Sequence, residues 1–358
     1  MKYIRLLFIS LFFIFSSVSA VEPEHSAQDL LNAKLNFFVG KGDLKKVNEL
    51  LDAGADINYR FEQNWGGISG TVISRPWGHR NIDMLALLLS RGLDPNIAGD
   101  PGQSPLVIDT WDYAFCVAIR PKDRDCQNDG AGYYRKRVSM LLDFGADPNF
   151  IGNNPRGPRI PLVEAVRAGD FSLVKRMLSM GADPNKQGGR DETALMVAAN
   201  MRNFEIMDFL LDNGADVDIK DDMGRTVVDR EHYLSSKSSS RVVVHLLDNN
   251  RITNINAHAL AYAAVGWRDS ELLERVLSMG ADANMRPPRG EYTPLISAII
   301  SKFSLGVEIL LQHGASPTLP ELDKDGEVGE TPLEIAEKLR NARIIQLIRS
   351  YMDKEIRD

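Results

Sequence analysis

The residues that could carry out chemistry are few, and they are not spaced as catalytic or metal sites require. The six histidines stand singly and far apart, without the short spacing of a zinc site; they are His25, His79, His232, His245, His258 and His313. The sequence has no glycine-rich phosphate loop, no His-Glu-x-x-His and no Gly-x-Ser-x-Gly. It therefore predicts no catalytic residue, no metal site and no cofactor.

Acidic residues are numerous, but they recur at the same positions of a repeated phrase. Six of them fall at expected helix ends and turns: Asp52, Asp56, Asp143, Asp147, Asp212 and Asp216. A structural role explains such positions better than general acid–base catalysis, which needs groups gathered around one reaction centre. We therefore expect that the protein is not an enzyme.

Cys116 and Cys126 are the only two cysteines. In an oxidising compartment, a disulfide between them would close a short loop and stabilise the fold by about 2–3 kcal/mol. The alternative is two free thiols, one of them buried in a helix. We favour the disulfide because the N-terminus carries an export signal.

The first twenty residues are typical of a cleaved secretory signal. Lys2 and Arg5 precede the apolar stretch Leu6–Phe15, which is too short for a comfortable membrane span. Val18 and Ala20 are small residues in the positions that a signal peptidase reads. The alternatives are an uncleaved anchor helix and a chance apolar N-terminus. We expect cleavage after Ala20, a periplasmic location and no membrane insertion afterwards.

The composition is that of a soluble globular protein, with 44% hydrophobic and 25% charged residues. The net charge is −7, and without Lys2 and Arg5 it is −9 because 40 basic residues then face 49 acidic ones. An acidic chain argues against binding to nucleic acid or to an anionic membrane.

The elements that would position any binding residue come from one phrase, repeated along the chain. Its copies are LLDAGADIN at Leu50–Asn58, LLSRGLDPN at Leu88–Asn96, LLDFGADPN at Leu141–Asn149, MLSMGADPN at Met177–Asn185, LLDNGADVD at Leu210–Asp218, VLSMGADAN at Val276–Asn284 and LLQHGASPT at Leu310–Thr318. The glycines are 38, 53, 36, 33, 66 and 34 residues apart. A period near 33 predicts a solenoid of stacked units. The longest gap holds a degenerate copy in which Asn250 replaces the glycine.

Each phrase reads as the end of a helix followed by a turn. The leucines close an amphipathic helix, the glycine permits a left-handed cap, and Asp-x-Asn turns the chain into a loop. A second signal begins the next helix, because Thr or Ser caps it and Pro fits its first turn. This signal stands at Ser104-Pro105-Leu106, Thr293-Pro294-Leu295 and Thr331-Pro332-Leu333, where Glu334 completes a capping box.

These phrases, together with Thr71-Val72-Ile73, Gly78-His79 and Leu87-Leu88-Leu89, resemble the ankyrin-repeat family over roughly Ala27 to Met352. The resemblance implies an all-α fold, an ankyrin-repeat solenoid of about nine helix-turn-helix repeats with hairpin loops. It implies a domain at 21–358, with an N-terminal capping repeat at 27–58, repeats over 59–318 and a C-terminal cap at 319–358. Such a fold does not by itself specify a function.

Two segments depart from the regular period. Apart from the interval that holds the degenerate copy, the longest interval between these glycines runs from Gly92 to Gly145. It carries an insertion that we place at residues 120–133. The Cys116–Cys126 disulfide would pin this insertion to a helix end. The serine-rich segment Ser235–Ser240 is expected to be a surface loop.

Stacked repeats imply a concave surface of first helices and hairpin tips, where we expect a protein partner. Several central tips are basic, which would steer an acidic partner, although ordinary solvated loop charge is the alternative. Aromatic anchors are common at interfaces, but for Trp77, Trp111 and Phe115 a small core under the insertion is the favoured alternative. The residues predicted to contact the partner are Trp65, Tyr133, Arg156, Arg159, Arg190, Arg225, Arg286 and Arg289.

The resemblance extends to exported bacterial ankyrin-repeat proteins, among them immunity proteins of secreted toxin effectors. It implies a monomeric periplasmic inhibitor that binds and neutralises a toxin enzyme. One alternative is a scaffold or stress-protection factor with an endogenous protein partner. Another is an enzyme or an effector aimed at a host.

Overall fold

The computed structural model describes residues 26–65, 68–70, 81–98, 103–119, 121–122, 126, 130–152, 157–228, 230, 237–248, 257–286, 292–321 and 328–355. The predicted signal segment, residues 1–20, lies outside these ranges. Within them, no helix is long and apolar enough to cross a membrane.

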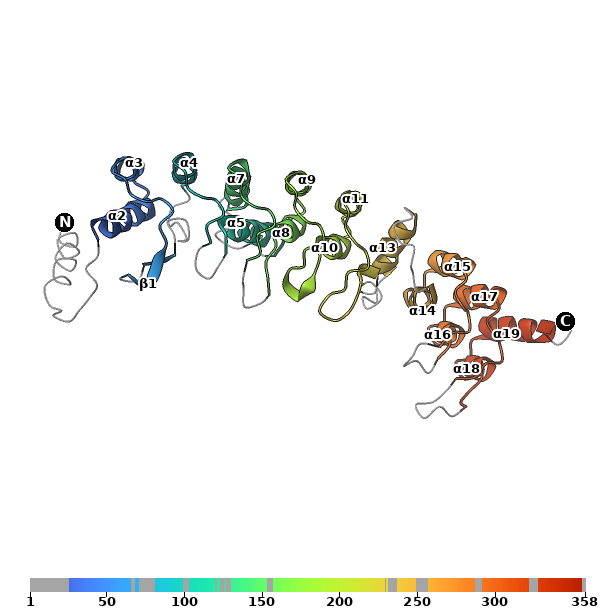
Figure 1. Cartoon of the computed structure of the whole chain (residues 1–358). Coiled ribbons are helices and arrows are strands. Elements are labelled where there is room, and N and C mark those ends of the chain that lie inside the picture. Colours follow the sequence, from blue (N-terminus) through green and yellow to red (C-terminus); the bar gives the residue numbers. More distant parts are fainter. Residues whose placement is uncertain are drawn as a thin grey trace. The chain divides into compact units, whose positions relative to one another are not determined.

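The described residues form sixteen α-helices, which correspond to about eight helix-turn-helix units (Figure 1). First helices of the repeats are α2 (Ala27–Lys41), α5 (Pro105–Ala114), α8 (Pro161–Arg167), α10 (Ala194–Asn200), α14 (Ala257–Trp267), α16 (Pro294–Ile300) and α18 (Pro332–Lys338). Second helices are α3 (Leu44–Asp52), α4 (Ile82–Ser90), α7 (Gly130–Asp143), α9 (Phe171–Ser179), α11 (Phe204–Asp212), α13 (Lys237–Asp248), α15 (Ser270–Ser278), α17 (Ser304–Gln312) and α19 (Ala342–Glu355). The helical repeat fold predicted from the sequence is confirmed.

Shorter elements complete the described chain. Strands β1 (Phe61–Trp65) and β2 (Ile68–Gly70) form an antiparallel hairpin, a π-helical turn η1 (Phe115–Ile119) follows α5, and a 3-10 turn η2 (Gly189–Asp191) precedes α10. The first helices expected in the second and sixth repeats fall on residues 71–80 and 229–236, which lie largely outside the described ranges.

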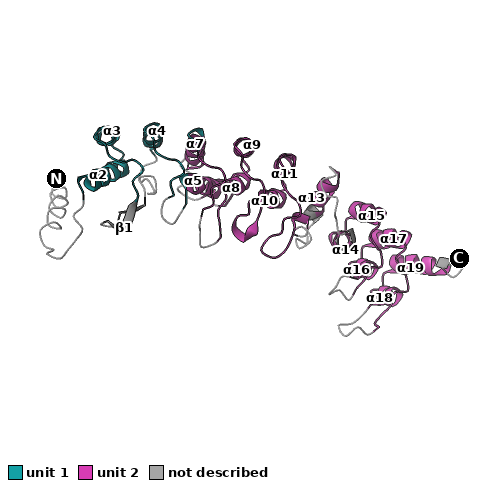
Figure 2. Ribbon diagram, viewed as in Figure 1, with its two compact units in different colours: residues 1–105, 143–145 teal, residues 106–142, 146–358 magenta. Residues whose placement is uncertain are grey.

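The chain divides into two compact units (Figure 2). Unit 1 comprises residues 1–105 with 143–145, and unit 2 comprises residues 106–142 with 146–358. In unit 2, the first helices α8 and α10 lie beside the hairpin loops, and the second helices α9 and α11 lie on their other side (Figure 1).

Helix ends follow the expected cap chemistry. Thr331 and Glu334 form the predicted capping box, in which the Glu334 carboxylate accepts from the Thr331 N–H at 2.8 Å. Gly181 and Gly214 end α9 and α11 with φ of 84° and 88°, a left-handed backbone that costs little without a Cβ atom. The serine-rich segment Ser235–Ser240 was expected to be a loop, but its last four residues are helical, since α13 begins at Lys237.

Repeats are joined by asparagine side chains at the end of the repeated phrase. Asn149 donates to the Gly181 carbonyl at 2.7 Å and accepts from the Asp183 N–H at 2.8 Å. Asn185 makes the same two bonds with Gly214 and Asp216, at 2.9 and 2.8 Å. The pattern recurs at Asn58 and Asn284. This asparagine therefore clamps the helix end of the following repeat as well as turning its own chain.

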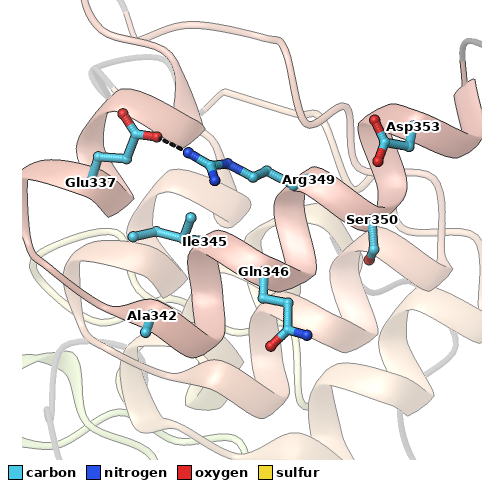
Figure 3. Close-up of a pocket in the computed structure, with 7 residues that line it drawn as sticks. All are labelled: Glu337, Ala342, Ile345, Gln346, Arg349, Ser350 and Asp353. Atoms are coloured by element: carbon cyan, nitrogen blue, oxygen red, sulfur yellow. Dashed lines mark hydrogen bonds and ion pairs between the residues drawn. The ribbon is translucent and has the colours of Figure 1, made fainter.

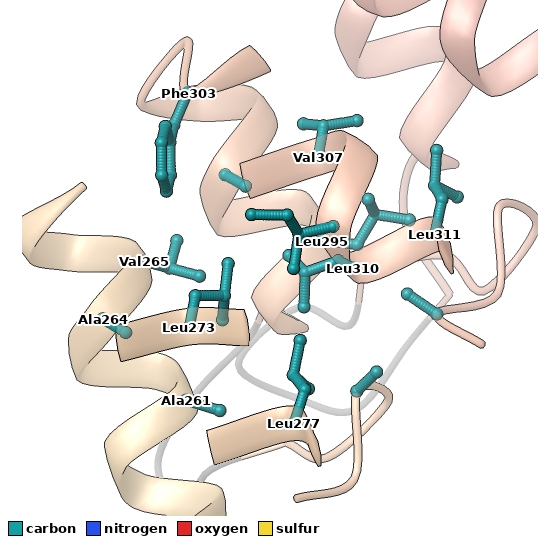
Figure 4. Packing of buried hydrophobic residues seen from close by; sticks show 14 of the residues in the cluster. Ala261, Ala264, Val265, Leu273, Leu277, Leu295, Phe303, Val307, Leu310 and Leu311 are labelled. Carbon is teal, nitrogen blue, oxygen red and sulfur yellow. The ribbon is translucent and has the colours of Figure 1, made fainter. Parts of the chain in front are cut away.

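The hydrophobic core of unit 2 lies between the first and second helices of stacked repeats. In its C-terminal part, Leu273, Leu295 and Leu310 converge from three helices and each is at most 1% exposed (Figure 4). Ala261 and Ala264 on α14 let that helix approach its neighbours closely (Figure 4). Because each repeat contributes only one layer of such side chains, its stability depends on its neighbours.

Cys116 and Cys126 form the predicted disulfide, with Cα atoms 5.0 Å apart. The bond links η1 to the segment before α7, so it ties the insertion to the end of the first helix. Helix α7 begins at Gly130, and the last four residues assigned to the insertion at 120–133 are therefore helical.

Candidate protein-binding surface

The partly exposed side of α5 and η1 presents a mixed aromatic and acidic surface. Ile108, Trp111, Asp112 and Phe115 are half-buried and follow one another at the three- and four-residue spacing of one helix face. Residues on the opposite side, such as Leu106, are fully buried. Helix α5 therefore uses one face for the core and leaves the other for contacts outside the repeat stack.

Arg159 lies over this surface. Its guanidinium carbon is 3.7 Å from the centre of the Trp111 ring, which is a close cation–π contact. Paired backbone hydrogen bonds between Gly152 and Arg159, at 2.9 and 3.0 Å, hold the hairpin in register. Trp111 also contacts Phe115, with ring centres 6.4 Å apart. The arginine that the sequence predicts at a hairpin tip thus packs against a first helix.

Asp109 and Arg137 connect α5 to α7 beneath this surface. Arg137 Nε donates to both carboxylate oxygens of Asp109 at 2.9 Å, and the two residues are 5% and 3% exposed. Burial raises the pKa of Asp109, and the Arg137 charge opposes that rise. Tyr133, one of the predicted contact residues, lies here, with its hydroxyl 3.3 Å from Arg137 Nη1. Tyr133 is half-buried and is positioned by this ion pair.

Asp112 differs from the other carboxylates of this region. Burial, followed by the nearby Asp109 charge, raises the pKa of Asp112 from its ordinary 3.8 to about 6, although Arg159 and Arg137 act in the other direction. Among the described residues, none donates a hydrogen bond to the Asp112 carboxylate or forms an ion pair with it.

A chain of ion pairs continues across the next three repeats of unit 2. We call it the charge network, and it consists of Glu164, Arg167, Glu192, Asp221, Arg225 and Arg230. Glu192 accepts from Arg167 at 3.3 Å and from Arg230 at 2.6 Å, so it links the fourth repeat to the sixth. Asp221 binds both Arg225 and Arg230, at 2.7 and 3.0 Å. Arginines and carboxylates alternate along it, so the charges largely cancel.

The side chain of Asp221 is fully buried under two arginines. Burial raises its pKa, but the hydrogen bonds from Arg225 and from the Arg225 and Met223 N–H groups outweigh that effect and hold the pKa at about 2. Glu164 is also buried, and burial raises its pKa against the opposing charges of Arg167 and Arg159. Asp221 is thus held by hydrogen bonds from two arginines, and Glu164 by its charge interaction with Arg167 at 3.3 Å.

The predicted contact residues are not all placed as the sequence suggested. Arg225 belongs to the charge network, and Arg286 donates to the Pro320 carbonyl at 2.5 Å. Arg190 is exposed, in a left-handed backbone conformation with φ of 62°. Trp65 lies in β1, and its side chain is outside what the structure describes, as are Arg156 and Arg289. Arg225 and Arg286 therefore make contacts within the repeat array.

Sequence reasoning missed the carboxylates of the charge network. Asp221 stands four residues before Arg225, and Glu164 three before Arg167, which are spacings that allow contact on a helix or in a tight turn. The pairing of Glu192 with Arg230 spans 38 residues, and only stacking of the repeats reveals it.

The tips of the fourth, fifth and sixth repeats contact one another through their backbones. A Cβ atom on Gly157 would lie 2.9 Å from the Gly189 Cα, so no larger residue fits there without movement. The Asp222 N–H donates to the Arg190 carbonyl at 3.2 Å, and the Gln187 side chain donates to the Lys220 carbonyl at 2.8 Å. These bonds make the three tips one continuous edge.

Cavities lie elsewhere in the described part of unit 2. One of about 530 Å³ sits on α18 and α19 at the C-terminal cap, where Arg349 binds Glu337 at 2.7 Å beside Ile345 (Figure 3). Another of about 870 Å³ is lined by Phe204, His245 and residues of α13 and α15. Neither contains a residue predicted to contact a partner.

Comparison with known proteins agrees with this architecture. A family model described as ankyrin repeats in three copies matches residues 130–221 and 162–259. The phrase copies at Leu141–Asn149, Met177–Asn185 and Leu210–Asp218 lie in the matched region. This part of the chain is an ankyrin-repeat domain. Proteins built of these repeats generally act as binding scaffolds for other proteins.

Relatives of this chain include a bacterial ankyrin-repeat protein that aligns over most of its own length. The chain is 27% identical over 194 residues to the ankyrin repeat protein YahD of Escherichia coli K12, covering 51% of this chain and 92% of that protein. It is 30% identical over 214 residues to the human mitochondrial disaggregase, covering 56% of this chain but only 28% of that protein. A solved ankyrin repeat domain from Acinetobacter baumannii is 26% identical, covers 53% of this chain and 97% of that one, and has a TM-score of 0.44.

Proposed function

We propose that this ankyrin-repeat protein is an exported, non-catalytic binding protein that holds a protein partner on the first-helix and hairpin surface of unit 2. The observation that carries the proposal is the charge network beside the Trp111–Asp112 face. Ion pairs hold the charged groups of the network, and Arg159 packs on the half-buried Trp111. A surface ordered in advance loses little conformational entropy on binding.

The most specific form of the proposal is a periplasmic immunity protein that neutralises a toxin effector enzyme by covering it. The signal-like N-terminus and the Cys116–Cys126 disulfide support an oxidising compartment. The resemblance to exported bacterial ankyrin proteins supports the inhibitor role. The alternative is a periplasmic scaffold or stress-protection factor with an endogenous partner.

The test is affinity capture with the chain from residue 21 onward, its disulfide intact, followed by mass spectrometry. The captured protein is then purified and its enzymatic activity titrated with this chain. We expect inhibition at a one-to-one ratio for an immunity protein, and binding without inhibition for a scaffold. Gene neighbourhood gives a second criterion, because a toxin gene next to this one supports immunity.

Two variants locate the interface. Trp111→Ala removes an aromatic side chain from the proposed surface, and Lys136→Ala changes an exposed residue of the second helix α7. We expect the first to weaken capture and the second to leave it unchanged. Equal binding by the folded Trp111→Ala variant would place the interface elsewhere.

A further inference from the structure

Asp112 is a half-buried carboxylate on the first-helix face, with no hydrogen bond or ion pair to any described residue. Other carboxylates of unit 2 are bound: Asp109 by Arg137, Asp170 by Arg135 and Asp221 by Arg225. A carboxylate that is partly removed from water without a partner loses solvation that nothing replaces. This loss of solvation disfavours the charged carboxylate, and it accounts for most of the rise of the Asp112 pKa to about 6.

Apolar and aromatic side chains flank Asp112 on its helix face, and the Arg159 guanidinium lies nearby, over the Trp111 ring. Trp111 and Phe115 stand beside Asp112 on the same face, and Val117 and Ile119 in η1 are 38% and 43% exposed. The Cys116–Cys126 disulfide holds η1 in place. Aromatic side chains in a fixed surface are frequent binding hot spots, and one face of the Trp111 ring already holds a cation, the Arg159 guanidinium.

From these contacts we propose that the Trp111–Asp112 face, with Phe115, Val117 and Ile119, is the subsite for a Lys or Arg side chain of the partner protein, flanked there by apolar residues. The cation would pair with the unbound carboxylate, and the apolar flanks would cover the exposed aliphatic groups of η1. This inference rests on the proposed function and names the chemistry of the partner at that surface.

Charge supports a basic partner more than an acidic one. The chain carries −7 overall, so a basic surface is attracted to it at long range. Among the basic tips that would attract an acidic partner, Arg225 is already paired with Asp221, and Arg286 is engaged by the Pro320 carbonyl. Asp112 is where a new positive charge finds an anion without displacing an existing ion pair.

The experiment selects 12-residue random peptides by display on the chain from residue 21 onward, with the disulfide formed. Affinities of the enriched peptides are then measured for the wild type, Asp112→Asn and Trp111→Ala. Asp191→Asn is the matched control, because Asp191 is an exposed carboxylate on a hairpin tip whose left-handed backbone also suits Asn. Circular dichroism and thermal melts confirm that every variant is folded.

We expect the enriched peptides to carry Lys or Arg next to an aromatic or aliphatic residue. Their affinity should fall tenfold or more for Asp112→Asn and change less than twofold for Asp191→Asn. Replacing the peptide's cation by Gln should cause the same loss on the wild type and no further loss on Asp112→Asn.

Two results would overturn the inference in distinguishable ways. Peptides that need Trp111 but neither a cation nor Asp112 would refute the cation subsite and leave the proposed binding surface standing. A failure to enrich any peptide, or peptides insensitive to both variants, would count against the subsite and the proposed surface together.

Discussion

Asp109 of α5 and Arg137 of α7 form an ion pair that is buried on both sides, with side chains 4% and 6% exposed. The pair lies between the two helices that flank the insertion of the third repeat. It joins them across a stretch of chain that interrupts the regular helix–turn–helix connection. The geometry of this enlarged repeat therefore depends on a polar contact inside the core.

Removing one partner of this pair should be costly. In Arg137→Met, the Asp109 carboxylate stays buried without its counter-charge, and the free energy of unfolding should fall by about 3–5 kcal/mol. The double variant Asp109→Leu/Arg137→Met removes both charges and should recover most of that loss. Urea denaturation of the three proteins measures both effects. If the double variant is no more stable than Arg137→Met, the unpaired charge of Asp109 is not the cause of the loss.

Asp112→Asn should stabilise the protein in a pH-dependent manner. Because the folded state raises the pKa of Asp112 from 3.8 to about 6, the folded state binds more protons than the unfolded state between these values. Wild-type stability is therefore lost as the pH rises through this window. After allowance for partial exposure, the free energy of unfolding of Asp112→Asn should exceed that of the wild type by about 2 kcal/mol at pH 7. At pH 4 the two values should be almost equal.

Denaturation of both proteins at pH 4, 5, 6 and 7 tests this prediction. The low pKa of Asp170 and of Asp221, each about 2, has the opposite consequence: their contributions are lost as the pH falls from about 4 to 2. Asp170 and Asp221 are present in both proteins, so their contributions cancel when the two free energies of unfolding are subtracted. A stability difference between Asp112→Asn and the wild type that narrows as the pH rises would contradict a raised pKa of Asp112 in the folded state.

The asparagine clamp between repeats should be measurable at Asn185. Asn185→Ala loses one donated and one accepted hydrogen bond to the next repeat, and should lower the free energy of unfolding by about 1–3 kcal/mol. Asn200→Ala, at an exposed position of α10, is the control and should change it by less than about 0.5 kcal/mol. Similar values for the two variants would mean that the clamp contributes no net stability.

The disulfide should stabilise the protein through a loop that is only ten residues long. Reduction of the disulfide is expected to lower the free energy of unfolding by about 2–3 kcal/mol and to lower the melting temperature. The Cys116→Ser/Cys126→Ser variant should melt at the reduced value with or without reductant. Mass spectrometry of unreduced peptides from the exported protein checks that the bond forms there, and quantitative alkylation of both thiols without reductant would show that it does not.

The tip arginines should differ in what they do for folding. Arg190 is exposed, so Arg190→Glu should change the free energy of unfolding by less than about 0.5 kcal/mol. Arg225→Glu places a second carboxylate beside the buried Asp221 and should cost about 2 kcal/mol or more. Thermal melts of the two variants make the comparison. Equal melts would indicate that Arg230 alone satisfies Asp221.

Much of the fold was accessible from the sequence because its determinants are local. A leucine pair followed by Gly181 ends a helix wherever it occurs, and Thr331 with Glu334 begins one, since both effects act within a few residues. Repetition of these signals at a period near 33 then predicts stacking, because no single repeat can bury its own apolar face. The Cys116–Cys126 pairing was also predictable, since these are the only two cysteines.

The proposed binding surface could be recognised only in the tertiary structure, because its contacts cross between repeats. The sequence shows arginines at the tips but not that Arg159 covers Trp111, or that Arg230 reaches Glu192. It also gives no sign that Asp112 stands without a partner while Asp109 has one. Stacking brings residues 30 to 50 positions apart into contact, and small rotations of a helix decide which charges meet, so charge balance at this surface is a property of the assembled array.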